Sequence, residues 1–499
     1  MTNAGGVAPE RSLRLGSQAA RGAATLVAVR VVLWSLSLVQ SVVVARTVPP
    51  RELGLYALAL AVASLASRLK QIGSAEKLVR DPESELAASL GAAFAVELAT
   101  ALVGSFGLIA AVWLIPWSGA DWRSRTVITL LGVTLLQPLA ELPAALFHRR
   151  LQFNKLAARH LGASATAVAV TIGGALGGLG LWSLVLGQIA GVAASALAFW
   201  RGVTPRPSLR LERHVVDRYV RFGVPLWGVG LLYALAERGS VLVVSSVLGL
   251  ATVGYVHLAQ SLTARLNQAN DATNAAVYPA LRSIAENSAR FREVLERTNR
   301  VFALGGVPLG VALALFAADW IPLAFGPTWT PAVPFVSAYC LAWGFSAIGY
   351  PCHLAFQVRG DTGPLFLYGS AAFLGRFVAV VGGVIAFGEG GLVAAVLGGA
   401  AISVATRTMM IRRMFPEFSL LALAVRPVFT AAAAVAATRL VMIAAPHAGF
   451  EPLLRGSVFT CAAVAGTWLL DRATLSDAAV QVRGAVGARA GDRYGGRER

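Results

Sequence analysis

The residues with the most distinctive chemistry in this sequence are ionisable side chains placed inside long apolar segments. A charge in a membrane span costs at least about 2.5 kcal/mol, so such side chains normally face an aqueous cavity or one another. Asp319, Arg426 and Arg439 lie near segment ends, where they reach water. The ionisable residues deeper in the apolar segments are Arg30, Glu97, Glu141, Glu237, Arg238, Arg265, Asp271 and Arg376.

One apolar segment, Thr252 to Tyr278, carries a broad polar face. A face of this breadth does not point at lipid. The alternative is a buried, hydrogen-bonded contact between helices. Such a contact usually needs fewer polar residues than this face carries, so the pattern favours a path for a solute. The residues at helical spacing are Gln260, Asn267, Asp271, Asn274 and Tyr278, with Ser261, Arg265 and Gln268 beside them.

A second stripe, in the segment Val333 to Gln357, combines aromatic and polar residues at steps of three and four. Aromatic faces with polar neighbours suit sugar rings, and Tyr339, Trp343 and Tyr350 are the candidate sugar contacts. Packing and interfacial anchoring are alternative roles for these rings. His353 is more often a structural hydrogen-bonding residue than a proton carrier. The whole stripe is Tyr339, Trp343, Ser346, Tyr350, His353 and Gln357.

Arginines in the two halves of the chain are candidates for holding an anionic diphosphate, because a guanidinium presents donors in a fork matched to phosphate oxygens. They are Arg30, Arg238 and Arg265. Gln40 shares a helical face with Arg30. An ion pair of Arg30 with Glu97 or Glu141 is the alternative role. Candidate ion-coupling residues are Glu97, Glu141, Glu237, Asp271 and His353.

These segments belong to an all-α integral membrane protein. The 499 residues are 56% hydrophobic and 14% charged, which excludes an ordinary soluble domain. A span needs about 20 helical residues. The sequence predicts about fourteen spans: Gly22 to Ala45, Leu53 to Ser67, Leu86 to Ile115, Val127 to Phe147, Leu161 to Leu179, Trp182 to Trp200, Phe222 to Leu248, Thr252 to Tyr278, Val301 to Ile321, Val333 to Gln357, Pro364 to Phe387, Gly391 to Thr406, Leu421 to Ala445 and Gly456 to Leu470.

The basic residues predict the orientation. Of the 43 Lys and Arg residues, 32 fall on the side that carries both termini, five on the opposite side and six within spans. Both termini are therefore expected in the cytoplasm, with long inner loops at 201–221 and 280–300. The net charge of +18 is spread over short clusters between spans, which indicates anionic membrane lipids as partners and not nucleic acid.

A weak internal repeat appears at a shift of 200 residues, where Gly54 meets Gly254 and the hydrophobic pairs at 43–44 and 58–59 meet 243–244 and 258–259. It predicts two pseudo-symmetric six-helix bundles and two extra helices. The expected divisions are a cytoplasmic N-terminal segment (1–21), an N-terminal bundle (22–200), a cytoplasmic basic linker (201–221), a C-terminal bundle (222–410), helices 13 and 14 (411–470) and a basic cytoplasmic tail (471–499).

Catalytic, nucleotide and metal motifs are absent from the sequence. No phosphate-binding GxxxxGK[ST] loop occurs, and the predicted outer loops are too short for an extracytoplasmic catalytic domain. Cys340, Cys352 and Cys461 are widely separated and are expected to be packing residues. We expect no enzyme activity, no cofactor and no metal.

Three motifs carry a resemblance to a known family. The stretch VVVARTVPPRELGLYALALAV at 42–62 resembles the amino-terminal signature of bacterial polysaccharide flippases. The order Glu237, Arg238, Leu248, Gly249 and then Gly254 to Ala259 is similar to the start of that family's carboxy-terminal bundle, although Glu237 stands where Asp is usual. Tyr278, Pro279 and Ala280 before the predicted inner loop, followed by the turn with Phe325, Gly326 and Trp329, complete the pattern.

The resemblance is to the polysaccharide transport branch of the multidrug, oligosaccharidyl-lipid and polysaccharide exporter superfamily, and it covers roughly residues 20 to 440. It implies two bundles that rock about a central cavity. It also implies a flippase for undecaprenyl-diphosphate-linked oligosaccharide in the inner membrane, with other polysaccharide-assembly proteins as partners. A multidrug or cation exporter of the same superfamily and a membrane-embedded glycan polymerase or ligase are the alternatives. A basic cavity repels cationic drugs, and the short outer loops disfavour the polymerase.

Overall fold

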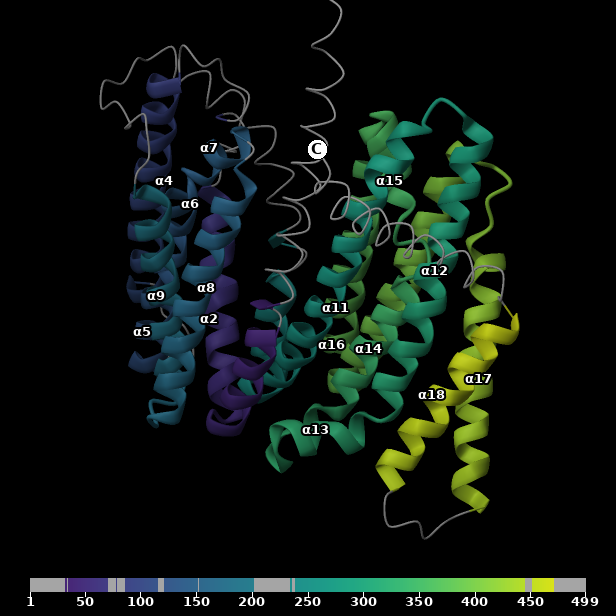
Figure 1. Cartoon of the computed structure of the whole chain (residues 1–499). Coiled ribbons are helices and arrows are strands. Elements are labelled where there is room, and N and C mark those ends of the chain that lie inside the picture. Colours follow the sequence, from purple (N-terminus) through teal and green to yellow (C-terminus); the bar gives the residue numbers. More distant parts are fainter. Residues whose placement is uncertain are drawn as a thin grey trace, which may run out of the picture. The chain divides into compact units, whose positions relative to one another are not determined.

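The structure is a computed structural model, and its described residues form helices and no strand (Figure 1). The all-α prediction is confirmed for this part of the chain. Two compact units divide it, here called the N-terminal and C-terminal units. The first comprises the described residues of Met1–His257 together with Ala324–Trp329, and the second those of Leu258–Leu323 and Thr330–Arg499. The described residues are 32–33, 35–70, 78, 86–114, 121–150, 152–201, 234–235, 238–444 and 451–470.

The N-terminal unit is built on a core where α2, α4, α5 and α9 meet, with Leu55, Val127 and Leu181 among its buried residues. Pro50 is the first residue of α2. A backbone N–H at this position would have no partner within the helix, so the N–H that proline lacks costs no hydrogen bond. Asp121 caps α5 by accepting a hydrogen bond from the backbone N–H of Ser124. The helices are α2 (Pro50–Lys70), α4 (Leu86–Leu114), α5 (Trp122–Leu131), α6 (Gln137–Glu141), α7 (Ala144–Arg149), α8 (Phe153–Leu176) and α9 (Leu181–Trp200).

The predicted span Val127 to Phe147 is not one continuous helix. After α5 the chain tightens into the 3-10 helix η2 (Gly132–Leu136), continues as α6 and turns again before α7. Pro138 and Pro143 supply no backbone N–H, so the regular i to i−4 ladder is interrupted beside each of them. Glu141 therefore lies at the end of a short helix instead of in the middle of a long one.

Gly54 and Gly254, the glycines matched by the repeat, form a helix crossing within the N-terminal unit. A Cβ on Gly54 would lie 1.7 Å from the carbonyl oxygen of Leu250, and a Cβ on Gly254 would lie 2.1 Å from that of Pro50. The contact is reciprocal, because positions 50 and 54 of α2 meet positions 254 and 250 of α11 (Leu250–Ser283). Only glycine permits backbones to approach this closely.

The turn Ala324–Trp329 is anchored beside this crossing. The Trp329 indole, which is fully buried, donates from Nε1 to the carbonyl oxygen of Ala45 at 2.7 Å. Arg46 donates from Nε to the carbonyl of Ala324 at 2.9 Å, and the Tyr255 ring meets the Trp329 ring edge to face. These contacts bring together segments nearly 300 residues apart in the sequence.

The C-terminal unit contains most of α11 and the helices that follow it. In Figure 1, α17 and α18 lie together as a hairpin, and α12 and α14 are neighbours. The elements are α12 (Ser288–Leu315), α13 (Ala317–Phe325), the 3-10 helix η3 (Pro327–Ala332), α14 (Val333–Ser346), α15 (Cys352–Arg359), α16 (Thr362–Met414), α17 (Leu420–Ala444) and α18 (Glu451–Leu470).

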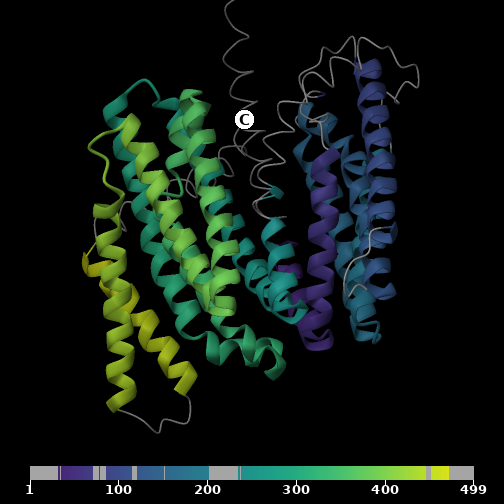
Figure 2. The same cartoon turned by 180° about the vertical axis from the view of Figure 1, so that it is seen from behind.

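Helix α16 is two arms joined at a sharp kink (Figure 2). Gly388 has φ of 59°, in the region that favours glycine, and the chain doubles back there. Gly383 and Gly391 pack backbone to backbone across the kink, and Arg376 of the first arm contacts Gly399 of the second. The kink lies between the two predicted spans Pro364 to Phe387 and Gly391 to Thr406.

The expected inner loop at 280–300 is mostly helical, which corrects the sequence prediction. Helix α11 continues to Ser283 and α12 begins at Ser288, so only residues 284–287 connect them. Asn287 caps α12 by accepting from the backbone N–H of Arg290. The sequence prediction ended each span at the first run of polar residues. The helices continue past that point, because a helix pairs its own backbone groups and need not stop at the edge of the bilayer core.

Six helical segments of the described chain are long and apolar enough to cross a membrane. These segments expose large apolar side chains: Leu114 is 79% exposed, Phe387 78% and Leu440 67%. Exposed leucine and phenylalanine on this scale are typical of a lipid-facing surface and not of a soluble one. The protein is a multi-pass membrane protein.

Candidate functional site

The polar face of α11 lies in the C-terminal unit and is tied to the neighbouring helix. Gln260 donates from Nε2 to the Tyr339 hydroxyl on α14 at 3.0 Å. Half-buried Arg265 donates from Nη1 to the carbonyl of Ser261, one turn earlier, at 2.9 Å. This contact bends the guanidinium back along its own helix. Asn267 is exposed.

Asn274 is the least satisfied member of this face. Its residue is 5% exposed, and neither amide atom has a hydrogen-bond partner among the described residues. An unpaired buried amide is unfavourable, since both its donor and its acceptor lose water without replacement. Trp343 on α14 has the same feature, because it is 8% exposed and its Nε1 has no partner in the described part of the chain.

The predicted span Val333 to Gln357 is interrupted, which corrects its expected continuity. It forms α14 and α15, separated by residues 347–351. Gly349, with φ of 77°, and Pro351 lie in the gap and disfavour a regular helix there. Tyr350 therefore lies in the interruption, and His353 lies in the first turn of α15.

Tyr350 joins the interruption to α11. Its hydroxyl donates to Asp271 Oδ1 at 2.6 Å, and its ring stacks on Phe302 of α12, with centroids 6.2 Å apart. His353 Nδ1 lies 2.8 Å from the Tyr350 carbonyl oxygen, and its ring meets that of Tyr350 edge on. The structure thus brings together Asp271, Tyr350 and His353, which the sequence analysis assigned to two separate stripes.

The described candidates in the N-terminal unit lie on different helices. Glu97 on α4 is 3% exposed, and Glu141 accepts a hydrogen bond from Gln137 Nε2 at 3.1 Å on α6. Gln40 is half-buried in the helix at 35–47, and Arg238 is half-buried at the start of the helix Arg238–Leu248. Two further candidates, Arg30 and Glu237, lie outside the described residues.

Arg407 is the residue that the sequence analysis missed. The predicted span ended at Thr406, whereas the second arm of α16 continues to Met414 and carries Arg407 inside it. Its Nη1 donates to the carbonyl of Ser346, at the end of α14, and lies 3.4 Å from the carbonyl oxygen of Ile348. Its guanidinium carbon lies 5.4 Å from the centre of the Tyr350 ring. The sequence signal for this contact was the pair Gly349 and Pro351. Together they predict that a helix ends there, and the last carbonyls of a helix need hydrogen-bond donors from elsewhere.

These polar groups are linked to one another by hydrogen bonds: Gln260 to Tyr339, Tyr350 to Asp271, and Arg407 to the Ser346 carbonyl. They come from α11, α14, α16 and the interruption, and amide, hydroxyl and guanidinium groups are types that can bind a polar solute. Among the described residues, no group of three or more His, Cys, Asp and Glu side chains has the geometry of a metal site. Cys340 and Cys352 are buried, as expected for packing residues, whereas Cys461 is exposed.

Comparison with known proteins assigns the family. Residues 43–334 match a family described as polysaccharide biosynthesis protein, and this match covers more than half of the chain. The chain belongs to this family. The resemblance read from its motifs is therefore confirmed.

Two curated relatives carry names consistent with the polysaccharide biosynthesis family. The lipopolysaccharide biosynthesis protein WzxC of Escherichia coli K12 is 24% identical over 337 residues, which span 64% of this chain and 66% of that protein, just under two thirds. The succinoglycan biosynthesis transport protein ExoT of Rhizobium meliloti is 24% identical over 378 residues, 73% of each chain.

Solved structures show the fold that this family member adopts. The lipid II flippase MurJ in an inward closed conformation aligns with a TM-score of 0.70 at 14% identity, covering 90% of this chain and 99% of its own. An inward-facing multidrug resistance transporter of the MATE family, from the MOP superfamily, aligns with a TM-score of 0.60 at 13% identity over 80% and 98%. The fold is that of a membrane transporter.

Proposed function

We propose that this protein is a flippase that moves an undecaprenyl-diphosphate-linked oligosaccharide from the inner to the outer leaflet of the cytoplasmic membrane. The movement would occur by alternating access, in the service of exopolysaccharide or lipopolysaccharide biosynthesis. The observation that carries the proposal is the combination of a transporter fold with membership of the polysaccharide biosynthesis family. A protein of this fold and this family has a substrate that must cross the membrane.

The polar groups of the C-terminal unit support a sugar-containing substrate. Tyr339 and Tyr350 present hydroxyls already held by Gln260 and Asp271, so they are oriented before any ligand arrives. Aromatic rings with fixed polar edges suit sugars, whose faces carry C–H groups and whose rims carry hydroxyls. In this proposal Trp343 contacts sugar once the cavity opens, and Asn267 and Asn274 line the path.

The anionic head of the substrate would meet arginines. Arg265 lies on the same face of α11 as Gln260, and its guanidinium presents N–H donors in a planar fork that matches phosphate oxygens. Arg30 and Arg238 are proposed as its counterparts, with Gln40 beside Arg30. Glu97, Glu141, Glu237, Asp271 and His353 are proposed ion-coupling residues. The proposal needs no cofactor and no covalent chemistry.

The proposed architecture has fourteen spans in the cytoplasmic membrane and both termini inside the cell. Helices 1 to 6 (22–200) and 7 to 12 (222–410) would form the two bundles, the segment 201–221 the basic linker and 411–470 the extra helices. Segments 1–21 and 471–499 would be cytoplasmic. The basic inner surface would contact anionic lipids, and other polysaccharide-assembly proteins would supply and consume the substrate.

The test is complementation of a strain that lacks its own polysaccharide flippase, scored as surface polymer at matched membrane abundance. The variants are Arg265→Ala and, as a matched control, Arg290→Ala, which removes an exposed arginine at the start of α12. Wild type and Arg290→Ala are expected to restore polymer, and Arg265→Ala to lower it.

Three outcomes contradict parts of the proposal. Efflux of cationic dyes without polymer would make the protein a drug exporter. Polymerisation of a purified lipid-linked sugar would make it an enzyme. Polymer restored equally by wild type and Arg265→Ala would keep the flippase but remove Arg265 from the site.

A further inference from the structure

The interruption between α14 and α15 creates a local need for positive charge. The last carbonyls of a helix lack the N–H groups that would follow in a continued helix, and they form the negative end of its dipole. Helix α14 ends at Ser346, and the next turns are short: the N–H of Ile348 bonds to the carbonyl of Phe345 at 3.0 Å, and that of Tyr350 to Ala347 at 3.2 Å. The carbonyls of Ser346 and Ile348 point to another partner.

That partner is Arg407, which reaches the interruption from the second arm of α16. One guanidinium nitrogen, Nη1, serves both the Ser346 and the Ile348 carbonyls. The stem of the side chain also fills the space beside Gly349, where an added Cβ would lie 3.5 Å from Arg407 Cδ. That distance is an ordinary van der Waals contact, and the closest atom to such a Cβ is Leu420 Cδ1 at 2.7 Å, so the left-handed glycine makes the turn and leaves room for Leu420.

In the described part of the chain, the Arg407 guanidinium contacts neutral groups. Among the described residues, the salt bridges involve other arginines, and none joins Arg407 to a carboxylate. Its neighbours are two carbonyl dipoles and the face of the Tyr350 ring, 5.4 Å from the guanidinium carbon. Carbonyls and a ring face are groups that attract a cation.

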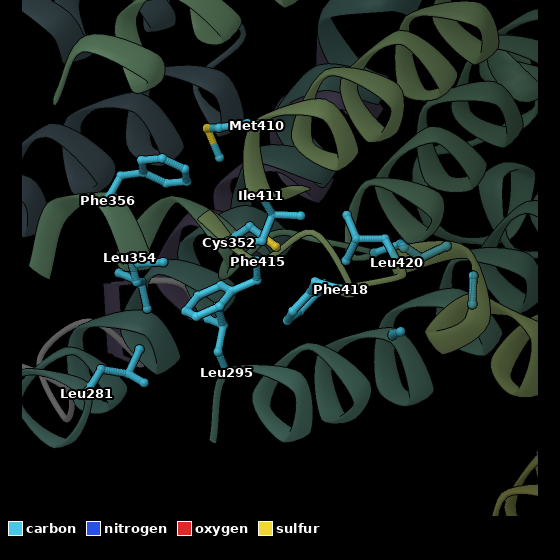
Figure 3. Close-up of a cluster of buried hydrophobic side chains, with 14 of the residues drawn as sticks. Leu281, Leu295, Cys352, Leu354, Phe356, Met410, Ile411, Phe415, Phe418 and Leu420 are labelled. Carbon is cyan, nitrogen blue, oxygen red and sulfur yellow. The ribbon is translucent and has the colours of Figure 1, made fainter. Parts of the chain in front are cut away.

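The surroundings hold this contact in place. A hydrophobic cluster packs α15 against α12, the second arm of α16 and the start of α17, and Cys352, Ile411, Phe415 and Leu420 gather in it (Figure 3). Ile411 follows Arg407 by one helical turn, and Cys352 follows the interruption directly. Packing therefore holds both ends of the contact, and Ile348 of the interruption lies in the same cluster, while the guanidinium bonds to the Ser346 and Ile348 carbonyls.

We propose that Arg407 is a positioning residue, acting as a built-in cation that holds the interrupted helix and thereby presents Tyr350 to Asp271 on the polar face of α11. Transporters with broken helices use the exposed carbonyls to coordinate soluble cations. In this chain the cation is covalently attached. The inference rests on the proposed function for its link to transport, but the structural contact does not depend on it.

The experiment is chemical rescue by guanidinium. Arg407→Ala removes the cation and leaves a space of matching shape, and Arg407→Lys keeps a charge without the planar fork. Arg412→Ala, which removes an exposed arginine from the same helix, is the control. Each variant is tested for surface polymer in the complementing strain with millimolar guanidinium chloride, or with tetramethylammonium chloride at the same concentration.

We expect Arg407→Ala to lose about tenfold in polymer, the factor that corresponds to losing one hydrogen bond to a charged group. Guanidinium should restore part of it, tetramethylammonium should not, Arg407→Lys should be intermediate, and Arg412→Ala should match wild type. Activity of Arg407→Ala equal to that of Arg412→Ala would overturn the proposal. So would a folded, inactive Arg407→Ala that guanidinium does not rescue.

Thermal stability of the purified proteins separates this inference from the transport function. Guanidinium at millimolar concentration should raise the melting temperature of Arg407→Ala in a saturable way and leave wild type unchanged, because a ligand that binds only the folded state stabilises it. This result is expected even if wild type fails to restore polymer. If Arg407→Ala does not accumulate, guanidinium during growth should restore its abundance, and equal abundance with and without it would refute the proposal.

Discussion

Replacing Gly54 by alanine tests whether the glycine crossing is as close as the structure makes it. An alanine in a helix interior is normally favoured over glycine by about 0.5–1 kcal/mol. Here its Cβ would lie 1.7 Å from the Leu250 carbonyl oxygen, whereas real contacts of this kind exceed 3.0 Å. The two helices must separate by more than an ångström, and overpacking of this kind costs typically about 1–3 kcal/mol. We expect Gly54→Ala to be destabilised by roughly 1 kcal/mol after the helix gain is subtracted from the middle of that range.

The assay is thermal unfolding of the purified protein in detergent, followed by tryptophan fluorescence. Gly162→Ala in α8 is the control, because an added Cβ there meets nothing within 4 Å. Gly254→Ala should also destabilise, since its Cβ would lie 2.1 Å from the Pro50 carbonyl oxygen. The double variant should cost less than the sum of the two, because separating the helices once accommodates both methyl groups.

Two results would refute this reasoning. Gly54→Ala as stable as Gly162→Ala would mean that the backbones are not in contact. Strictly additive losses in the double variant would mean that Gly54 and Gly254 do not belong to one crossing.

Three further predictions concern the N-terminal unit. Trp329→Phe should lower stability by about 1–3 kcal/mol in thermal unfolding, because it leaves the buried Ala45 carbonyl without its donor, and an unchanged melting temperature would contradict that bond. Glu52→Gln should cost about 1 kcal/mol by weakening the 2.7 Å ion pair with Arg123, which is 38% exposed and therefore screened, and Arg123→Gln should add nothing further if the pair is the cause. Hydrogen bonds from Ser124 lower the pKa of Asp121, so its capping contribution is complete above the unfolded pKa and is lost as pH falls through the folded pKa. The stability deficit of Asp121→Ala, about 0.5–1 kcal/mol at neutral pH, should accordingly shrink in acid, and a constant deficit would argue against the cap.

The sequence by itself determined the membrane class, the approximate positions of the helices and the family. These follow from local patterns: apolar length predicts a span, and polar residues at helical spacing predicted the face of α11. The motif around 42–62 was enough to indicate polysaccharide transport, and the family match agrees. The spacing of polar residues and the length of an apolar run can both be recognised in the sequence without knowing which segment packs against them.

Only the tertiary structure decided where those helices break and which polar groups meet. Asp271 and Tyr350 are 79 residues apart, and Arg407 reaches carbonyls about 60 residues earlier in the chain. The repeat matched Gly54 with Gly254, but their contact became visible only when both backbones were placed. Such pairings depend on the packing of distant segments, and a buried carbonyl accepts any suitable donor, so no local pattern specifies its partner.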